Sequence, residues 1–491
     1  MHGIKLICIN ICLYSLMPVI SQNTANIHGP GLDPINIILP ARYFSIVLNE
    51  NSNKSSAIEF KARGHAFNSG DTKRPCRVWH NILNRRDGSF IARYKLYEEC
   101  INFQLEVTQD GVHLGGSPYK FGKAVIKHEM CNCPRDFNHW LVKNQCGDVP
   151  EQVQMDLQYF RNINWAKLRS QVIERFNKPE AISICHYVIS DNRLYRKCYG
   201  EHVGFKMFTD NILLFLLRRI KFPDMEFMTN LGDWPLVREK AVPVFSWCGS
   251  EDTYDIVMPT YDITQATLEN MGRVTLDMLS VQGNTPRQWD EREAKVFWRG
   301  RDSHPSRLKL IDIAKEHPEL FNVSMTNFFF YKNKQEKYGP KSPHVSFFKF
   351  FDYKFQIGID GTVAAYRFPY LLAGGSLIFK QTSKYYEHFY HLLKPEEHYI
   401  PIEEDLSDLK SKVDWAVNHD DESQQMAKNA QEFANNHLLP NDIICYHAHL
   451  FNEYSKLLSG DNSLLDGMEE VPQPTESQTC QCLPDQLKDE L

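Results

Sequence analysis

The chain contains 491 residues, carries a formal net charge of -6 and has a pI of about 6.3. Hydrophobic residues make up 42% and aromatic residues 12%. The length suggests about three domains of roughly 150 residues each. The hydrophobic content is high enough to form cores, and it excludes global disorder. The mildly acidic balance excludes the basic surface on which nucleic-acid-binding proteins depend.

Both ends of the sequence predict entry into the secretory pathway and retention within it. His2 and Lys5 precede an apolar run over residues 6–16, and the small residue Ser21 follows. This pattern is typical of a signal peptide, here residues 1–21, with a buried core helix as the alternative. Neither this run nor any later segment reaches the roughly 20 residues of a membrane span. The last four residues match the signal that the endoplasmic-reticulum retrieval receptor binds, so we expect a lumenal protein retained through Lys488, Asp489, Glu490 and Leu491.

Residues 24–130 predict a small β-sandwich. Runs rich in β-branched and aromatic residues at 42–48 and 90–97 and an alternating run at 101–107 are typical of strands. Asp87-Gly88 fits a hairpin turn. A sandwich is the simplest fold for such a pattern.

Three phrases make this prediction more specific: Gly29–Leu32, Asp87–Phe90 and His113–Tyr119. Together and in this order, they resemble a filamin-type immunoglobulin-like repeat. The resemblance implies a module that binds or spaces partners. No catalytic constellation is visible within it.

Thirteen cysteines are present, and two of them lie in the predicted signal peptide. In an oxidising lumen the remaining eleven are expected to form structural disulfides, with at least one thiol unpaired because the count is odd. The alternative is that the close pairs Cys131–Cys133 and Cys480–Cys482 bind a metal ion, although the cysteines of zinc sites usually have wider spacings. Asn53 and Asn322 begin glycosylation sequons.

Beyond residue 131, predicted strands and helices alternate, which indicates α/β architecture with parallel sheets. We expect two Rossmann-like lobes facing a cleft, residues 131–270 and 271–458, followed by a flexible tail over 459–491. Predicted strands lie at 181–189, 225–229, 242–246, 296–298, 356–359 and 376–380, and predicted helices at 203–220, 420–437 and 443–457.

The segment 297–307 predicts a strand, a polar loop and a helix. Pro305 suits the first helical residue, with Ser303 or His304 at the N-cap. A helix N-terminus attracts anions, and the arginine fork matches phosphate oxygens. The segment therefore predicts a diphosphate pocket built with Arg299, Arg301 and Arg307. A surface loop whose arginines pair with local acids is the alternative.

The segment 356–367 predicts a second strand, glycine turn and helix. Gly361 and the small residues after it allow a ligand to approach the backbone, and their N–H groups are suited to a pyrophosphate. Arg367 is expected about one helical turn further on. The alternative is a simple turn with a packed helix.

Asp233 lies in the segment Asn230–Pro235, just past the carboxyl end of the predicted strand 225–229. In open α/β sheets, ligands bind at the carboxyl ends of strands. A carboxylate there is able to accept a proton from an attacking hydroxyl. A turn aspartate that caps local N–H groups is the alternative.

These motifs resemble the Rumi-like protein O-glucosyltransferases of glycosyltransferase family ninety, and in particular the KDEL-bearing members with an amino-terminal filamin repeat. The resemblance covers essentially the whole chain and rests on Leu231–Pro235, Val296–Arg307, Asp360–Phe368 and His398–Pro401. It implies a GT-B fold. It also implies an inverting, metal-independent transfer of glucose from UDP-glucose to a serine of a folded EGF-like repeat, with no further cofactor.

By resemblance, Asp233 is the general base, Arg307 grips the diphosphate and Glu387 holds the ribose. Arg301 stands where KDEL-bearing relatives also have an arginine. Cys445 is expected to pair with the start of the catalytic body, at Cys131 or Cys133. The remaining donor-site residues implied are Gly361, Thr362, Val363, Ala364, Ala365, Tyr366 and Arg367.

The acceptor side departs from the Rumi-like pattern. Where those members have a cysteine-closed loop before the base, residues 197–203 hold the single Cys198, and Thr260–Gly272, which is expected to shape the sugar pocket, is divergent. A xylosyltransferase, a catalytically silent lumenal binder of EGF-like repeats and a filamin-type scaffold with an inert body are therefore the alternatives. Expected partners are EGF-like repeat proteins of Notch or matrix type and the KDEL receptor, but neither nucleic acid nor membrane.

Overall fold

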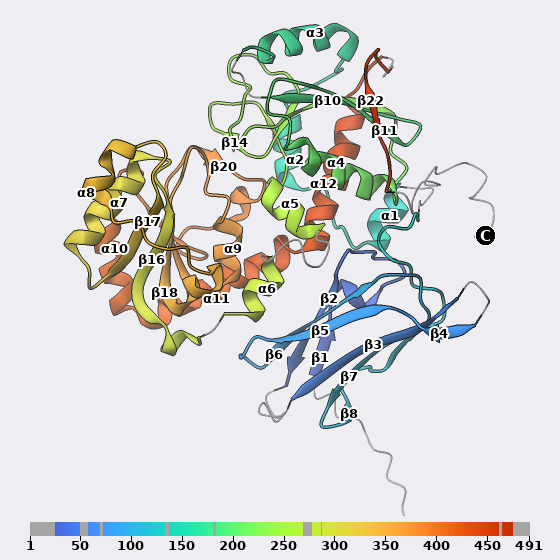
Figure 1. Ribbon diagram of the computed structural model, residues 1–491, viewed down its shortest axis with the longest axis horizontal. Helices are drawn as coiled ribbons and strands as arrows, with labels where there is room; N and C mark the ends of the chain where they lie inside the picture. Colours follow the sequence, from blue (N-terminus) through green and yellow to red (C-terminus); the bar gives the residue numbers. More distant parts are fainter. Residues whose placement is uncertain are drawn as a thin grey trace, which may run out of the picture.

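The computed structural model describes residues 25–49, 57–68, 72–132, 137–179, 183–268, 277–285, 287–460 and 464–474. These residues form an N-terminal β unit and two α/β units (Figure 1). The predicted signal peptide, Asn53, Cys133, the Cys480–Cys482 pair and the KDEL sequence lie outside the described residues. Within them, no helix combines the length and the apolar character that crossing a membrane requires.

The N-terminal unit consists of two antiparallel sheets around one core. The first has the strand order β1-β2-β6-β5, and the second has the order β4-β3-β7-β8 with β9 also on β7. Phe44, Phe60, Tyr94 and Phe103 are buried between them. The strands are β1 (Ala25–His28), β2 (Arg42–Leu48), β3 (Ile58–Phe67), β4 (Lys73–Pro75), β5 (Val78–Asn84), β6 (Ser89–Leu96), β7 (Ile101–Gln109), β8 (Val112–His113) and β9 (Tyr119–Phe121). The predicted strands and the hairpin at Asp87-Gly88 are confirmed, since β5 and β6 pair on either side of that turn.

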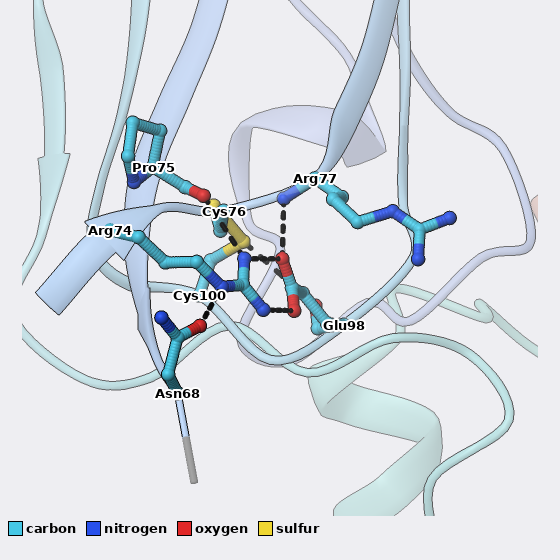
Figure 2. A network of polar contacts seen from close by, with 7 residues as sticks. All are labelled: Asn68, Arg74, Pro75, Cys76, Arg77, Glu98 and Cys100. Atoms are coloured by element: carbon cyan, nitrogen blue, oxygen red, sulfur yellow. Dashed lines mark hydrogen bonds and ion pairs between the residues drawn. A yellow bond between two sulfur atoms is a disulfide. The ribbon is translucent and has the colours of Figure 1, made fainter. Parts of the chain in front are cut away.

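A disulfide and an ion pair tie β4 and the residue that follows it to the connection between β6 and β7 (Figure 2). Cys76, just after β4, is bonded to Cys100, just before β7. Beside them Arg74 donates two hydrogen bonds to the Glu98 carboxylate, both at 2.6 Å, and the Arg77 main-chain N–H donates a third. These donors hold the pKa of Glu98 down at about 2, chiefly through Arg74. The connection is therefore fixed both covalently and electrostatically.

The first α/β unit has a mixed sheet with the order β15-β13-β12-β10-β11-β22. Only β12, β13 and β15 run parallel, so the prediction of a parallel sheet is wrong for the other half. Asp191 and Asn192 both have positive φ and close a two-residue hairpin between β10 and β11. Such a turn permits only antiparallel pairing. The strands are β10 (Ile184–Ser190), β11 (Arg193–Tyr199), β12 (Met225–Asn230), β13 (Val244–Ser246), β15 (Ile256–Val257) and β22 (Glu469–Val471).

Helices pack on this sheet and complete the unit. They are α1 (Phe137–Lys143), α2 (Glu151–Leu157), α3 (Trp165–Phe176), α4 (Lys206–Leu217), α5 (Tyr261–Thr267) and, from the far end of the chain, α12 (Pro440–Ser455). Figure 1 shows α12, in red, beside α2 and α4. Its residues Phe451 and Tyr454 pack against Phe227 and Phe245 of the sheet. The unit is therefore built from both ends of the transferase sequence.

Two expectations for the C-terminal segment are wrong. Cys445 is bonded to Cys146, not to Cys131 or Cys133, because α12 lies beside the end of α1, where Asn441 also donates to the Asn144 carbonyl. Part of the expected flexible tail forms β22, which pairs with β11 and buries Val471.

The second α/β unit has a wholly parallel sheet with the order β17-β16-β18-β19-β21. This is a doubly wound arrangement whose strand order reverses between β16 and β18, the place where such sheets bind ligands. The strands are β16 (Glu293–Arg301), β17 (Phe321–Asn327), β18 (Tyr353–Gly358), β19 (Leu377–Gln381) and β21 (Ile400–Ile402), and the helices are α6 (Met278–Gly283), α7 (Pro305–Glu316), α8 (Gln335–Tyr338), α9 (Phe368–Ala373), α10 (Leu409–Asn418) and α11 (Asp420–His437).

The three units contact one another. Strand β14 (Gly249–Ser250) of the first α/β unit pairs with β20 (Tyr385–Tyr386) of the second. The β5–β6 hairpin of the N-terminal unit meets the second α/β unit, where Arg93 donates to Ser280 at 3.0 Å and Arg85 donates to Gln431 at 2.8 Å. The expected crossover near residue 270 lies outside the described residues.

Candidate active site

Asp233 lies at the carboxyl end of β12, as the sequence predicted, in a rigid turn. The Asn230 side chain accepts from the Gly232 N–H and donates to the Trp234 carbonyl. The side chain of Asn230, and not that of Asp233, therefore makes the hydrogen bonds to the main chain of this turn. The Asp233 carbonyl accepts from the Tyr366 hydroxyl at 2.5 Å, which connects the two α/β units.

The Asp233 carboxylate remains available for chemistry. Its buried Oδ1 has no hydrogen-bond partner among the described residues, an arrangement that is rare for a buried polar atom. Burial raises the pKa of Asp233, while a hydrogen bond from Tyr261 and the charge of Arg301 act in the opposite direction. The result is a desolvated carboxylate with an unused oxygen, as a general base requires.

Asp262 was not singled out from the sequence. It lies in the first turn of α5, next to Tyr261, and is exposed to solvent. Its pKa is raised to about 6 because the surrounding protein desolvates it and Asp233 lies nearby, with Arg367 opposing the shift. Sequence reasoning assigned this segment to the sugar pocket as a whole, and no spacing identified Asp262 individually.

Arg307 lies beneath the switch point of the second sheet. Its helix begins at Pro305 with His304 as N-cap, as predicted. The buried guanidinium donates to the carbonyls of Asp360 at 2.8 Å, Arg301 at 3.1 Å and Ile359 at 3.2 Å. It therefore clamps the ends of β16 and β18 together and still has N–H groups left for a ligand.

Arg301, Arg307 and Arg367 form a positive cluster. Burial lowers the pKa of Arg307 to about 9, and the charges of Arg367 and Arg301 act in the same direction. Burial, together with the charge of Arg301, lowers the pKa of Arg367 to about 10. None of the three pairs with a carboxylate within the described residues. Arg299, the third arginine expected here, instead donates to Asn322. An unpaired group of guanidinium ions is suited to a multiply charged anion.

The loop 361–367 joins the two units. The helix predicted directly after Gly361 begins only at Phe368, with Arg367 as N-cap. The chain crosses between the units here because Val363, Ala364 and Tyr366 are buried in the core of the first α/β unit. Thr362 is exposed and Ala365 is buried.

The main chain of this loop begins against Arg307 of the positive cluster. The N–H groups of Thr362, Val363 and Ala364 donate to no acceptor in the part of the chain that the structure describes. Gly361 lies directly against Arg307, since a Cβ there would be 3.0 Å from Arg307 Nη2. The absence of a side chain at Gly361 therefore leaves the guanidinium open.

Glu387 is wholly buried near the same interface. Burial raises its pKa to about 8, with a hydrogen bond from Tyr390 opposing the shift. Its Oε1 accepts from the Tyr390 hydroxyl at 3.2 Å, whereas Oε2 has no partner among the described residues. A neutral carboxyl with a free oxygen is able to bind a hydroxyl group.

Other predicted sites lie apart from this cluster. Asn322 is half-buried in β17, and its Nδ2, the atom that would carry a glycan, donates to Tyr353 at 2.8 Å. Cys248 is a free, buried cysteine, which confirms that at least one thiol is unpaired. Cys198 is bonded to Cys185 across the β10–β11 hairpin. Within the described ranges, no group of three or more potential ligand side chains is arranged to hold a metal ion.

A separate cavity of about 260 Å³ lies at the Cys146–Cys445 disulfide. It is lined mainly by histidines and apolar side chains, including His388, His391 and His449. Neither Asp233 nor any residue of the arginine cluster reaches it. The candidate active site therefore lies apart from this cavity, where Asp233 of the first α/β unit comes close to Arg301 of the second.

Comparison with known proteins agrees with this geometry. Residues 142–489 match the family described as "Glycosyl transferase family 90". The chain is 45% identical to protein O-glucosyltransferase 2 of Danio rerio, over 96% of this chain and 95% of that protein. It is 41% identical to protein O-glucosyltransferase 3 of Homo sapiens, over 94% and 93%. Among solved structures, TarM aligns with 34% of this chain and 37% of its own at 16% identity and a TM-score of 0.28.

Proposed function

Because the chain belongs to glycosyl transferase family 90 and is therefore a glycosyltransferase, we propose that it is a protein O-glucosyltransferase. The donor is UDP-glucose, and the acceptor is a serine hydroxyl of a folded EGF-like repeat, in proteins of Notch or matrix type. The names of its relatives support the reaction class. The observation that carries the proposal is that the free Asp233 oxygen lies near an unpaired arginine cluster on the opposing unit.

In the proposed reaction, Asp233 takes the proton of the serine hydroxyl. The serine oxygen forms a bond to the anomeric carbon as the bond to UDP breaks, and the diphosphate leaves with the electron pair. Direct attack from the opposite face inverts the configuration. The contacts of Tyr366 and Cys248 with the Asp233 carbonyl hold the base in place, so that little reorganisation is needed during proton transfer.

The departing diphosphate gains one negative charge as its bond to glucose breaks, and the arginine cluster is proposed to stabilise that charge. Arg301, Arg307 and Arg367 provide fixed positive charge where negative charge develops, a form of electrostatic preorganisation. The free N–H groups after Gly361 add donors. We propose that these groups take the role that a metal ion has in other transferases. Glu387 is proposed to bind a ribose hydroxyl through its free oxygen.

The proposal extends to fold and compartment. The two α/β units that meet at the base and the arginines are proposed to be the lobes of a GT-B fold, and the N-terminal sandwich a filamin-type module. Three disulfides, Cys76–Cys100, Cys146–Cys445 and Cys185–Cys198, support an oxidising compartment. We propose the lumen of the endoplasmic reticulum, with retrieval by the KDEL receptor.

Mass spectrometry tests the reaction. A folded EGF-like repeat is incubated with the purified protein and either UDP-glucose or UDP-xylose, with and without a chelator. A hexose gain that resists the chelator is expected, and a pentose gain would reassign the enzyme as a xylosyltransferase. The variant Asp233→Asn is expected to keep its melting temperature and UDP affinity but to lose transfer. No gain from folded wild-type protein across several repeats would refute the proposal.

A further inference from the structure

We propose that four exposed aromatic side chains, Phe205, Trp234, Phe329 and Phe330, form the surface on which the protein acceptor docks. We call this set the aromatic rim. It extends the proposed function, on which it rests, by naming the residues that select the acceptor. Phe329 and Phe330 follow β17 on the second α/β unit, and the other two belong to the first.

The rim is exposed although it is apolar. Phe329 is 52% exposed and Phe330 is 67% exposed. Two adjacent phenylalanines with this exposure are unusual on a surface, and exposed apolar groups that gather at one place mark interaction sites. Trp234 and Phe205 are exposed to a lesser degree, at 42% and 38%.

The rim is also rigid. The wholly buried Asp302 accepts from the main-chain N–H groups of Phe329 at 2.7 Å and Tyr331 at 2.6 Å, which fixes the loop that carries both phenylalanines. Asn230 fixes Trp234 through its carbonyl. A surface that is ordered before binding loses little conformational entropy when a partner docks. Fixed exposure is therefore expected at a binding surface.

The rim adjoins the proposed base from both sides. Trp234 is the residue after Asp233. The Phe205 ring lies 4.8 Å from the Tyr261 ring, and the Tyr261 hydroxyl bonds to the Asp233 carboxylate. On the opposite unit, the Arg301 guanidinium lies 5.6 Å from the Phe329 ring, and the charge of Arg301 is felt by Asp233.

The position of the rim fits the protein acceptor, because its residues border the proposed base on the first α/β unit and Arg301 on the second. The rim carries no charge, whereas the donor is held by arginines and main-chain N–H groups. Aromatic residues are enriched where protein interfaces are tightest. We infer an occupant that is folded and presents apolar side chains beside its serine, because such a rigid surface meets both sides of the rim at once.

Kinetics with a folded EGF-like repeat test this inference. The variants Phe329→Ala and Phe330→Ala are expected to raise the acceptor KM at least tenfold, because each removes a central apolar contact. UDP affinity, measured by calorimetry, and melting temperature are expected to stay at wild-type values. The matched control is Phe67→Ala, which removes a phenylalanine that is 54% exposed on β3 of the N-terminal unit and is expected to change nothing.

The outcomes separate the two proposals. If the wild-type protein transfers no sugar in the mass assay, the proposed function fails before the rim is tested. If the wild type transfers sugar and both phenylalanine variants keep the wild-type acceptor KM, the rim proposal is overturned. Equal use of the reduced, unfolded repeat by the wild type would overturn the inference that the occupant is folded.

Discussion

The contact between Gly361 and Arg307 makes a precise test of the donor site possible. In the variant Gly361→Ala, the new methyl group would lie 2.8 Å from Ser303 Oγ and 3.0 Å from Arg307 Nη2. Ser303 has a side chain that is able to rotate. Arg307 is not free to move, because Nη2 donates to the Ile359 carbonyl and Nε to the Asp360 carbonyl.

The methyl group would therefore cover the guanidinium instead of displacing it. A hydrogen bond to a charged group contributes about 1.5–3 kcal/mol. Losing one such bond to the diphosphate should weaken UDP binding on the order of 10- to 150-fold, at 1.4 kcal/mol per factor of ten. The backbone at Gly361 does not need positive φ, so the fold should lose only about 1 kcal/mol, the lower end of the cost of overpacking.

Titration calorimetry with UDP measures the effect, and thermal unfolding monitors the fold. Gly204→Ala is the matched control, because a Cβ there would have no atom within 4 Å. It should leave both quantities unchanged. If Gly361→Ala binds UDP within twofold of the wild type while folded, Arg307 does not contact the diphosphate and the donor site must be placed elsewhere.

Three further predictions follow from single features of the structure. Arg307→Lys should weaken UDP binding and lower the melting temperature, because one ammonium group is unable to reach all three carbonyls that the planar guanidinium binds. An unchanged melting temperature would contradict the inference that Arg307 holds the ends of β16 and β18 together. The value of kcat/KM should fall as the solution is acidified, because the base must be ionised and burial raises the pKa of Asp233 above its ordinary value. The apparent pKa belongs to the coupled pair of Asp233 and Asp262, and a profile that is flat down to pH 4.5 would refute the assignment. Cys445→Ser should destabilise the protein by about 2–5 kcal/mol in denaturant unfolding, since a disulfide of long sequence separation is lost, and thiol labelling should find Cys146 newly reactive.

Features encoded by neighbouring residues were predictable from the sequence. The β5–β6 hairpin follows from Asp87-Gly88, and the start of α7 follows from Pro305 with a polar cap. Asp233 was found because a strand followed by a polar turn puts its first residues at the sheet edge. Arg307 was found by the same reasoning together with family resemblance.

Features that depend on distant partners were not predictable. Asp262 matters only because folding brings it to Asp233 and Arg367, and nothing in its own segment marks it. The loop after Gly361 was expected to be helical because the segment matches a pattern of strand, glycine turn and helix, but burial of Tyr366 against the other unit decides its course. The partner of Cys445 is likewise set by where α12 packs.

The return of α12 and β22 to the first α/β unit has a consequence for how the protein is made. Cys146 and Cys445 are separated by 299 residues, so at about 5–20 residues per second the ribosome needs on the order of 15–60 s between them. During this time the sheet that carries Asp233 has no α12 to cover Phe227 and Phe245. The second unit, which is continuous in sequence, is able to fold first. The half of the enzyme that is synthesised earlier is thus completed later, and its apolar surface needs protection by chaperones until the last helix emerges.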